Sequence, residues 1–288
     1  MRIKTAYLCF AALALLECSG LPAFEWPQEN VTASSFSSVF AQPRGGKFSG
    51  SLIFRAPAEV RSSDQGVALA VIREPDDGSD GFYSPLGNAV IIDHNDDLLM
   101  VYGNLHTVSI TPETAVIGAG GGIGMSGSSG WQNSGGGLEF QVVDEKNARL
   151  INPLVLMPRL ADERAARIFN VSASGKREES FRVAETPSFP AGTYIFYHDF
   201  DWSALPYRTI VSVNGVDVET IIYDMMVERN GKLTVRGKKY YAREEIYPDE
   251  RRMMLAEVPL LRGRNTIRFA AYNIHGAGLD TFFVVNNY

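Results

Sequence analysis

The sequence predicts a mainly β protein made of two domains. Short apolar runs of strand length recur along most of the chain, and turn residues separate them. Only one short segment, Asp162 to Arg167, has the composition of a helix. A chain of 288 residues is long for one β-domain and suits two.

The composition is that of a globular protein that can bury hydrophobic cores. Hydrophobic residues make up 45% of the chain and charged residues 21%. The formal net charge is -6, and no block of basic residues stands out. Nucleic-acid binding requires a basic patch, so we expect no nucleic-acid partner. The composition leaves the oligomeric state open.

The first 23 residues have the pattern of an export signal. Arg2 and Lys4 precede an apolar run, Ala6 to Leu16, which is too short to span a bilayer. Ala23 is a small residue suited to cleavage, so we expect residues 1–23 to be a signal peptide. No later stretch is long and apolar enough for a transmembrane helix.

Both cysteines, Cys9 and Cys18, lie in this expected signal peptide. A chain cleaved after Ala23 has none left, which excludes a disulfide and a thiolate metal site. The residues before Cys18 are similar to a lipoprotein cleavage box, except that Glu17 stands where a small residue is expected. A lipid anchor at Cys18 therefore stays open beside simple cleavage. We expect a periplasmic or cell-envelope location.

The first domain is expected over residues 24–160. Its strand signals are three apolar runs and one run that alternates as a half-buried strand does: Val67 to Ile72, Ala89 to Ile92, Leu98 to Tyr102, and Leu138 to Val142. Gly and Ser are so frequent from Gly118 to Gly137 that this segment predicts a loop over much of its length.

A linker is expected over residues 161–178 and a second domain over 179–288. Eight strand-like runs follow one another there at fairly regular spacing, which is typical of an antiparallel sandwich. They are Phe181 to Val183, Thr193 to Tyr197, Thr209 to Val213, Val218 to Tyr223, Lys232 to Val235, Met254 to Val258, Asn265 to Tyr272 and Thr281 to Val285. Asn214 and Gly215 suit the positive φ angles of a type I′ hairpin turn.

Four segments of the first domain carry a family resemblance. Gly87 to His94, followed by Val101 to Leu105, is similar to a hairpin that reads roughly G-N-x-V-x-I-D-H-G and then Y-x-H-L. Ile123 to Gly130 is similar to I-G-x-x-G-x-[ST]-G, Gly135 to Val142 to G-P-H-L-H-F-E-V, and Asn152 to Leu154 to the usual ending. In order and spacing, this region resembles the lysostaphin-type (LytM-type) zinc peptidoglycan endopeptidases. The resemblance implies their antiparallel β-sheet fold, which is similar to a duplicated hybrid motif.

The residues that use zinc in that family are replaced in this chain. The family's three zinc ligands correspond to Phe48, Leu52 and Glu139, the first two through a looser alignment with H-x-G-x-D. The two further histidines, which activate water and stabilise the transition state, correspond to Gly137 and Asn104. A catalytic zinc needs three protein ligands and an open position. The resemblance therefore implies a non-catalytic domain without a cofactor.

A zinc site rebuilt from other residues is the alternative. The chain has four histidines: His94, His106, His198 and His275. His106 lies two residues beyond Asn104, and strand alternation would keep both side chains on one face. A relocated site would combine His106 with Glu139 and either Asp93 or Asp96. The protein would then be an active zinc metalloendopeptidase of peptidoglycan.

For a degenerate member of the family, the resemblance implies binding rather than hydrolysis. We expect a groove lined by Tyr102, Asn104, His106 and Glu139. Its partner would be peptidoglycan, a cell-wall hydrolase or another envelope protein, and the sequence does not identify which.

The last third of the chain carries a second resemblance. Leu260 to Tyr272, with Asn273 after it, is similar to the final hairpin of bacterial immunoglobulin-like domains, L-x-x-G-x-N-x-I-x-x-x-A-x-D. It implies an immunoglobulin-like β-sandwich for the second domain. A structural or adhesive surface protein that acts through this domain is therefore another alternative function.

Overall fold

The computed structural model describes residues 24–75, 81–94, 97–111, 116–132, 136–175, 180–201 and 206–288. The expected signal peptide, with Cys9 and Cys18, lies outside the described residues, as does Asp96. A search of the described part of the chain for a helix able to cross a membrane finds none.

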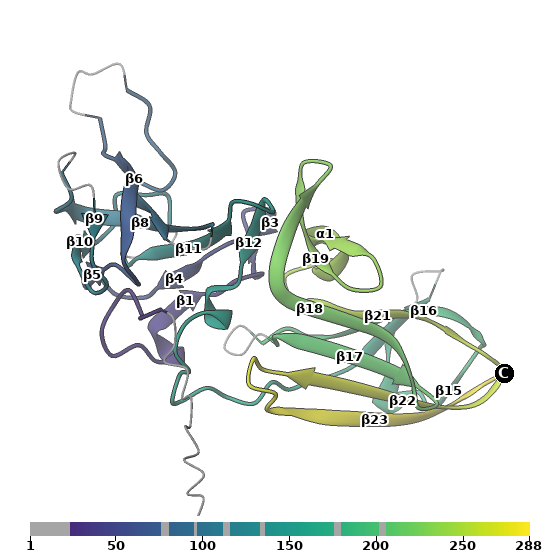
Figure 1. Ribbon diagram of the computed structural model, residues 1–288. Helices are drawn as coiled ribbons and strands as arrows, with labels where there is room; N and C mark the ends of the chain where they lie inside the picture. Colours follow the sequence, from purple (N-terminus) through teal and green to yellow (C-terminus); the bar gives the residue numbers. More distant parts are fainter. Residues whose placement is uncertain are drawn as a thin grey trace, which may run out of the picture.

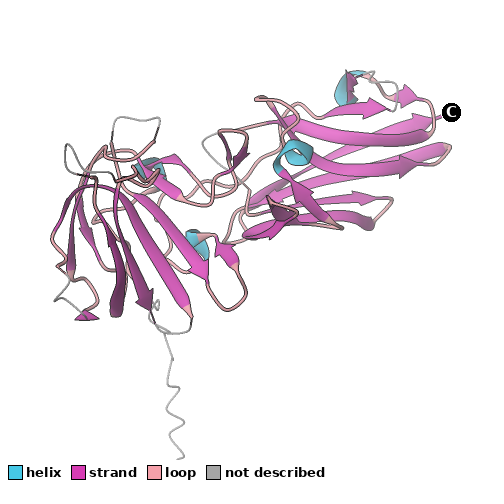
Figure 2. Cartoon of the chain, turned by 90° about the horizontal axis from the view of Figure 1, so that it is seen from above, coloured by secondary structure: helices cyan, strands magenta, loops and turns pink. Residues whose placement is uncertain are grey.

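The prediction of a mainly β protein is confirmed. Figure 1 shows two β bodies side by side, and the view from above in Figure 2 shows the same division. The one α-helix of the described residues, α1 (Arg243–Ile246), is a single turn in the second body. The domain boundaries themselves stay a prediction.

The first body contains strands β1 to β12. They are β1 (Phe36–Ser38), β2 (Pro43–Arg44), β3 (Lys47–Phe48), β4 (Leu52–Phe54), β5 (Glu59–Arg61), β6 (Gly66–Ile72), β7 (Asn88–His94), β8 (Leu98–Val108), β9 (Val116–Ile117), β10 (Gly122–Ser126), β11 (Glu139–Asp144) and β12 (Arg149–Ile151). β6, β7 and β8 form an antiparallel meander, and β11 joins β8 to β4. Each of the four strand signals of this region therefore lies on a strand.

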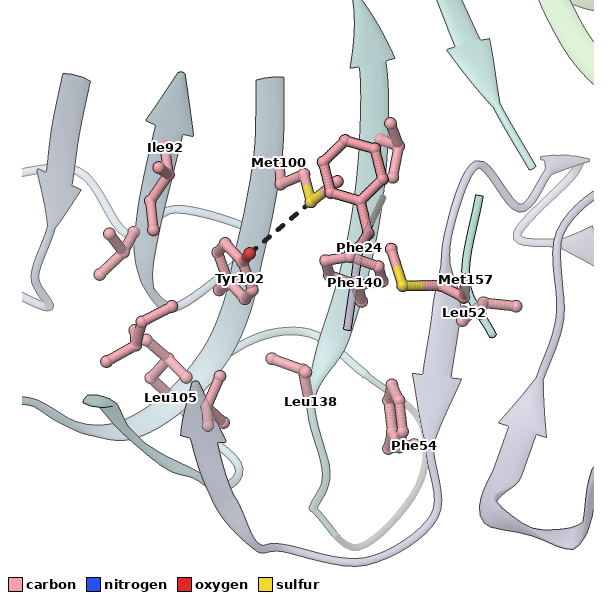
Figure 3. Close-up of a cluster of buried hydrophobic side chains, with 14 of the residues drawn as sticks. Phe24, Leu52, Phe54, Ile92, Met100, Tyr102, Leu105, Leu138, Phe140 and Met157 are labelled. Carbon is pink, nitrogen blue, oxygen red and sulfur yellow. Dashed lines mark hydrogen bonds between the residues drawn. The ribbon is translucent and has the colours of Figure 1, made fainter. Parts of the chain in front are cut away.

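One hydrophobic core holds the first body together. It extends along the chain from Phe24 to Leu160, and its centre includes Leu52, Tyr102 and Phe140, which have no exposed surface or almost none (Figure 3). The Tyr102 hydroxyl accepts a hydrogen bond from the Ser63 backbone N–H and donates to the sulfur of Met100. The polar atom of this buried ring is thereby satisfied.

The second body contains the remaining strands. They are β13 (Ser172–Gly175), β14 (Ser180–Arg182), β15 (Ser188–Phe189), β16 (Gly192–Asp199), β17 (Arg208–Val213), β18 (Val216–Arg229), β19 (Lys232–Arg236), β20 (Tyr240–Ala242), β21 (Arg252–Leu260), β22 (Gly263–Tyr272) and β23 (Gly278–Asn287). The sheet β14-β13-β16-β21 shares a core with the larger sheet, for example through Phe196 on β16 and Phe269 on β22. Asn214 and Gly215 have φ angles of 52° and 84° at the β17–β18 turn, as their sequence predicts.

Backbone pairing and a shared core join the two bodies. β12 pairs with β18, so the main sheet runs from one body into the other. Asn152, just after β12, donates its side-chain amide to the Tyr223 carbonyl on β18. A third hydrophobic cluster includes Phe40 and Phe48 of the first body and Tyr247 of the second.

One local prediction is wrong, and a second holds over most of its segment. Asp162 to Arg167 is not a helix but a turn followed by extended chain, because the Asp162 carboxylate accepts the Ala33 N–H and Ala166 forms a bridge to Gly278. The glycine-rich segment is turn or irregular over most of its described residues, as predicted. It also contains strand β10, because pairing with both β5 and β8 compensates for the low strand propensity of glycine.

Candidate functional site

Glu139 begins β11 at the point where three strands meet. It lies opposite Gly103 on β8 and Ile53 on β4. The next residue, Phe140, turns into the first core, so alternation along β11 turns Glu139 to the other face of the sheet. Glu139 is nevertheless buried, with 4% of its surface exposed.

Three donors satisfy the buried Glu139 carboxylate. Arg44 Nη1 lies 2.8 Å from Oε1 and forms an ion pair with it. The Ser51 hydroxyl donates to the same oxygen at 2.7 Å, and the Gln132 side-chain amide donates to Oε2. A buried carboxylate is stable only when it is paired and hydrogen-bonded, and here it is both.

Arg44 reaches Glu139 from the tip of the β2–β3 hairpin. Gly45 and Gly46 form the turn with φ angles of 54° and 79°, which glycine adopts without strain. At the base of the hairpin the Phe48 ring packs edge-to-face on Tyr247 of the second body, at 6.0 Å between ring centroids. The second body therefore anchors the hairpin that supplies the guanidinium.

Asn104 is the second sequence-predicted residue of the site and has a purely local role. Its φ angle is 60°, and its side-chain amide donates to the carbonyls of Gly127 and Gly137, both at 2.6 Å. Its oxygen accepts the Gly130 N–H at 2.8 Å. The amide is therefore satisfied within the protein and fastens two glycine-rich loop segments to β8.

Gly137 occupies a position that no other residue fits in this conformation. Its φ angle is 138°, and a Cβ atom there would lie 1.9 Å from the Phe54 carbonyl oxygen. The Phe54 backbone is itself held, because its N–H donates to the Leu138 carbonyl. A histidine at this position would therefore require a different backbone, and not only a different side chain.

The structure does not bring Phe48 or Leu52 to Glu139. Leu52 faces the first core on the side of Phe140, and Phe48 belongs to the cluster between the bodies. Ser51 is the residue on that segment whose side chain meets Glu139, because it precedes Leu52 and points to the opposite face. Leu52, expected at a ligand position, therefore lies on the opposite face of the sheet from Glu139.

Two of the four expected groove residues lie elsewhere. Tyr102 is fully buried in the first core, and this burial raises the pKa of its hydroxyl. His106 is exposed whereas Asn104 is buried, since the positive φ of Asn104 interrupts the alternation of β8. Of the expected groove, only Asn104 and Glu139 lie at this site.

The groups around Glu139 do not fit a zinc ion. A guanidinium, a hydroxyl and an amide N–H replace the ligands that zinc requires, and the one carboxylate already accepts from all three. Among the described residues, no three His, Cys, Asp or Glu side chains are placed to hold a metal ion. The structure therefore does not assemble His106, Glu139 and Asp93, while Asp96 lies outside the described residues.

Two hydrogen-bonded loops carry exposed aromatic rings, here called the aromatic rim, and one of these loops reaches Glu139. The rim consists of Phe82, Tyr83 and Trp131, which are 97%, 60% and 67% exposed. The Trp131 N–H donates to the Pro85 carbonyl, so the two loops that carry these rings are hydrogen-bonded to each other. Gln132, next to Trp131, is the residue that donates to Glu139.

The comparison with protein families assigns the first body. Residues 51–153 match the family model described as Peptidase family M23. This segment is an M23 peptidase domain. A second family model, which has no descriptive name, matches residues 165–287. Among the curated proteins, none matches the sequence.

Several solved structures are similar to parts of the chain. A mutant catalytic domain of the prophage-encoded M23 protein EnpA from Enterococcus faecalis has a TM-score of 0.34 and 22% identity, covering 41% of this chain and 87% of its own. A chain of the SpoIIQ–SpoIIIAH pore-forming complex has a TM-score of 0.36 and 20% identity, covering 49% and 94%. Lysostaphin has a TM-score of 0.35 and 13% identity, covering 88% and 94%.

Proposed function

We propose that the M23 domain of this protein is a non-catalytic binding module of the cell envelope. Its partner is peptidoglycan or a cell-wall hydrolase, and the chain reaches it after export directed by residues 1–23. We also propose that the second body is an immunoglobulin-like β-sandwich.

One observation supports the loss of catalysis above the others. The cation beside the buried Glu139 carboxylate is the Arg44 guanidinium, which the chain supplies itself. Because Gly137 has no room for a side chain, the group that would assist hydrolysis cannot be restored by one substitution. A metal would have to displace Arg44 and still lack two protein ligands.

The aromatic rim supports a binding role. Phe82, Tyr83 and Trp131 expose large ring surfaces that a partner can cover. Aromatic rings stack on sugar rings and on peptide chains, the two components of peptidoglycan. The rim also lies next to the region where M23 domains act, since Gln132 connects it to Glu139.

Metal analysis tests the loss of catalysis. The purified chain is incubated with zinc and dialysed against zinc-free buffer. The zinc that stays bound is then measured, together with the cleavage of muropeptides. We expect no stoichiometric zinc and no cleavage. One zinc per chain that a chelator removes together with cleavage activity would establish the relocated enzyme instead.

A pull-down with purified sacculi and with cell-wall amidases tests the binding role. The double variant Phe82→Ala/Trp131→Ala removes two rings of the rim without touching a core. We expect at least a tenfold loss of binding, since truncation of exposed aromatic anchors commonly has this effect.

The matched control for that experiment is Phe282→Ala on β23, a ring of the second body that is 59% exposed. It should bind like the unmodified chain. Loss of binding in this control, with the rim variant unaffected, would instead favour adhesion through the second body. Failure of the unmodified chain to bind either partner would contradict the proposal.

A further inference from the structure

A cavity lies between the two bodies, away from the Glu139 site. Its volume is about 390 Å³, which is within the range of small-molecule sites. One wall is the segment from Ala33 to Phe40, which includes β1, and the facing wall includes Tyr207 and Tyr223 of the second body. Residues of the connection between the bodies, Asp162 to Arg164, complete it.

The lining is apolar over much of its area and carries a few polar groups. The apolar part includes Phe36, Leu154, Leu160, Pro206 and Ile274. Such a mixture of apolar walls with few convergent polar groups is typical of ligand pockets at domain boundaries.

Two buried polar atoms of the lining, the Tyr223 hydroxyl and Glu163 Oε2, have no hydrogen-bond partner among the described residues. Tyr223 is 2% exposed, and no described group forms a hydrogen bond with its hydroxyl. Glu163 Oε2 is buried and lies 3.3 Å from His275 Nε2, without a hydrogen bond of ordinary geometry. Burial raises the pKa of the Glu163 carboxyl. Buried polar atoms without a hydrogen bond call for a ligand or water.

Two carboxylates of the lining, those of Asp162 and Glu163, offer acceptor atoms to a cationic group. Asp162, which is exposed, stands beside Glu163, and among the described residues its Oδ1 accepts the Ala33 N–H at 2.7 Å. Of the cationic groups nearby, Arg55 donates to the backbone carbonyls of Ser34 and Phe36, Arg164 is exposed as Asp162 is, and His275 lies 3.3 Å from Glu163. The carboxylates therefore have acceptor capacity left, whereas the guanidinium of Arg55 is already engaged.

We propose that this cavity binds a small amphipathic ligand with an apolar chain and a cationic amine. The ammonium group lies at the carboxylates of Asp162 and Glu163, and the chain lies against Phe36 and Leu154. This site is separate from the Glu139 site and does not depend on the function proposed for the M23 domain.

Three matched probes test the proposal on the full chain: hexylammonium, hexan-1-ol and hexanoate, which share their apolar chain and differ in charge. Binding is followed by calorimetry and by saturation-transfer NMR. We expect hexylammonium to bind saturably in the millimolar range, hexanol more weakly, and hexanoate not at all.

Two variants locate the binding. Glu163→Gln should weaken hexylammonium binding about tenfold, because it removes the charge and keeps the shape. Ser34→Trp, at an exposed position of the wall, should block the cavity and abolish binding. Glu185→Gln, an exposed carboxylate of the Arg182 ion pair, is the control and should bind like the unmodified chain.

Retention of hexylammonium binding in Ser34→Trp, or equal binding of hexanoate, would overturn the proposal. So would the absence of any hexylammonium binding by the unmodified chain. Circular dichroism of each variant establishes that a lost signal is not a lost fold.

Discussion

A Cβ atom at position 137 would lie 1.9 Å from the Phe54 carbonyl oxygen, and the φ angle of 138° is one that residues with side chains rarely adopt. Gly137→Ala should therefore lower the free energy of unfolding by about 3 kcal/mol, from backbone strain and overpacking together. Urea denaturation followed by circular dichroism measures this change.

Gly118→Ala is the matched control, because a Cβ atom there meets nothing within 4 Å and its φ angle is not in the left-handed region. It should change the free energy of unfolding by less than about 0.5 kcal/mol. Equal stabilities of the two variants would contradict the conclusion that position 137 excludes every side chain.

His198 on β16 is the residue whose charge state should couple stability to pH. Burial lowers its pKa from 6.5 to about 4, and only 2% of its surface is exposed. In the unfolded chain the His198 side chain takes up its proton near pH 6.5, whereas in the folded chain it does so only near pH 4. The contribution of this group to the free energy of unfolding therefore falls as pH decreases from 6.5 to 4, by about 3 kcal/mol at most.

The measurement is urea denaturation at pH 7.5 and pH 4.5 of the unmodified chain and of His198→Leu. The variant should lose less stability between the two pH values, because it cannot take up this proton on unfolding. The same pH dependence in both proteins would show that other groups cause the acid sensitivity.

At the residue scale, the sequence identifies part of the Glu139 site. Glu139, Asn104 and Gly137 are singled out by the family resemblance, whose motifs surround them in fixed order and spacing. Arg44 and Gln132 could not be predicted, because they lie in a hairpin and a loop. No local sequence pattern indicates which distant side chain will contact a buried carboxylate. The Gly45-Gly46 turn is the one available signal for the hairpin of Arg44.

At the element scale, the β2–β3 hairpin is the part of the fold that neutralises the site. Arg44→Ala should lower the free energy of unfolding by about 2 kcal/mol, because it leaves the Glu139 carboxylate buried without its counter-charge. The additional change Glu139→Gln should restore part of this loss, since a neutral amide needs no cation. A double-mutant cycle in urea measures the coupling.

Arg182→Ala removes an ion pair in which both side chains are mostly exposed, and it serves as the control. Its effect should stay within about 0.5 kcal/mol. If Arg44→Ala/Glu139→Gln were no more stable than Arg44→Ala alone, the effect of Arg44→Ala would not come from the unbalanced charge of the Glu139 carboxylate.

Strands are predictable from this sequence and the short helical pieces are not. Alternating and apolar runs such as Val67 to Ile72 lie on strands because burial against a sheet rewards that periodicity. Asp162 to Arg167 has helix-forming residues but is too short to form a helix without tertiary support. There, contacts with Ala33 and Gly278 favour an extended chain.

At the scale of the whole molecule, the contact between Phe48 and Tyr247 couples the two bodies. Phe48→Ala should lower the free energy of unfolding by about 3 kcal/mol, as truncation of a buried aromatic ring does. It should also separate the unfolding of the two bodies into two calorimetric transitions. Phe282→Ala, at the exposed face of β23, should leave a single transition at an unchanged temperature. A single transition in both variants would show that the other contacts between the bodies, the β12–β18 pairing among them, keep unfolding cooperative.

The pairing of β12 with β18 also has a mechanical consequence. Three residue pairs, from Arg149 and Val227 to Ile151 and Met225, connect a strand of one body edge-on to a strand of the other. On its other edge β12 pairs with β11, the strand that begins at Glu139. Besides the covalent connection, tension applied to the second body thus travels through these backbone hydrogen bonds directly to the strand of the Glu139 site. A force that pulls on the second body is thereby transmitted to the M23 domain.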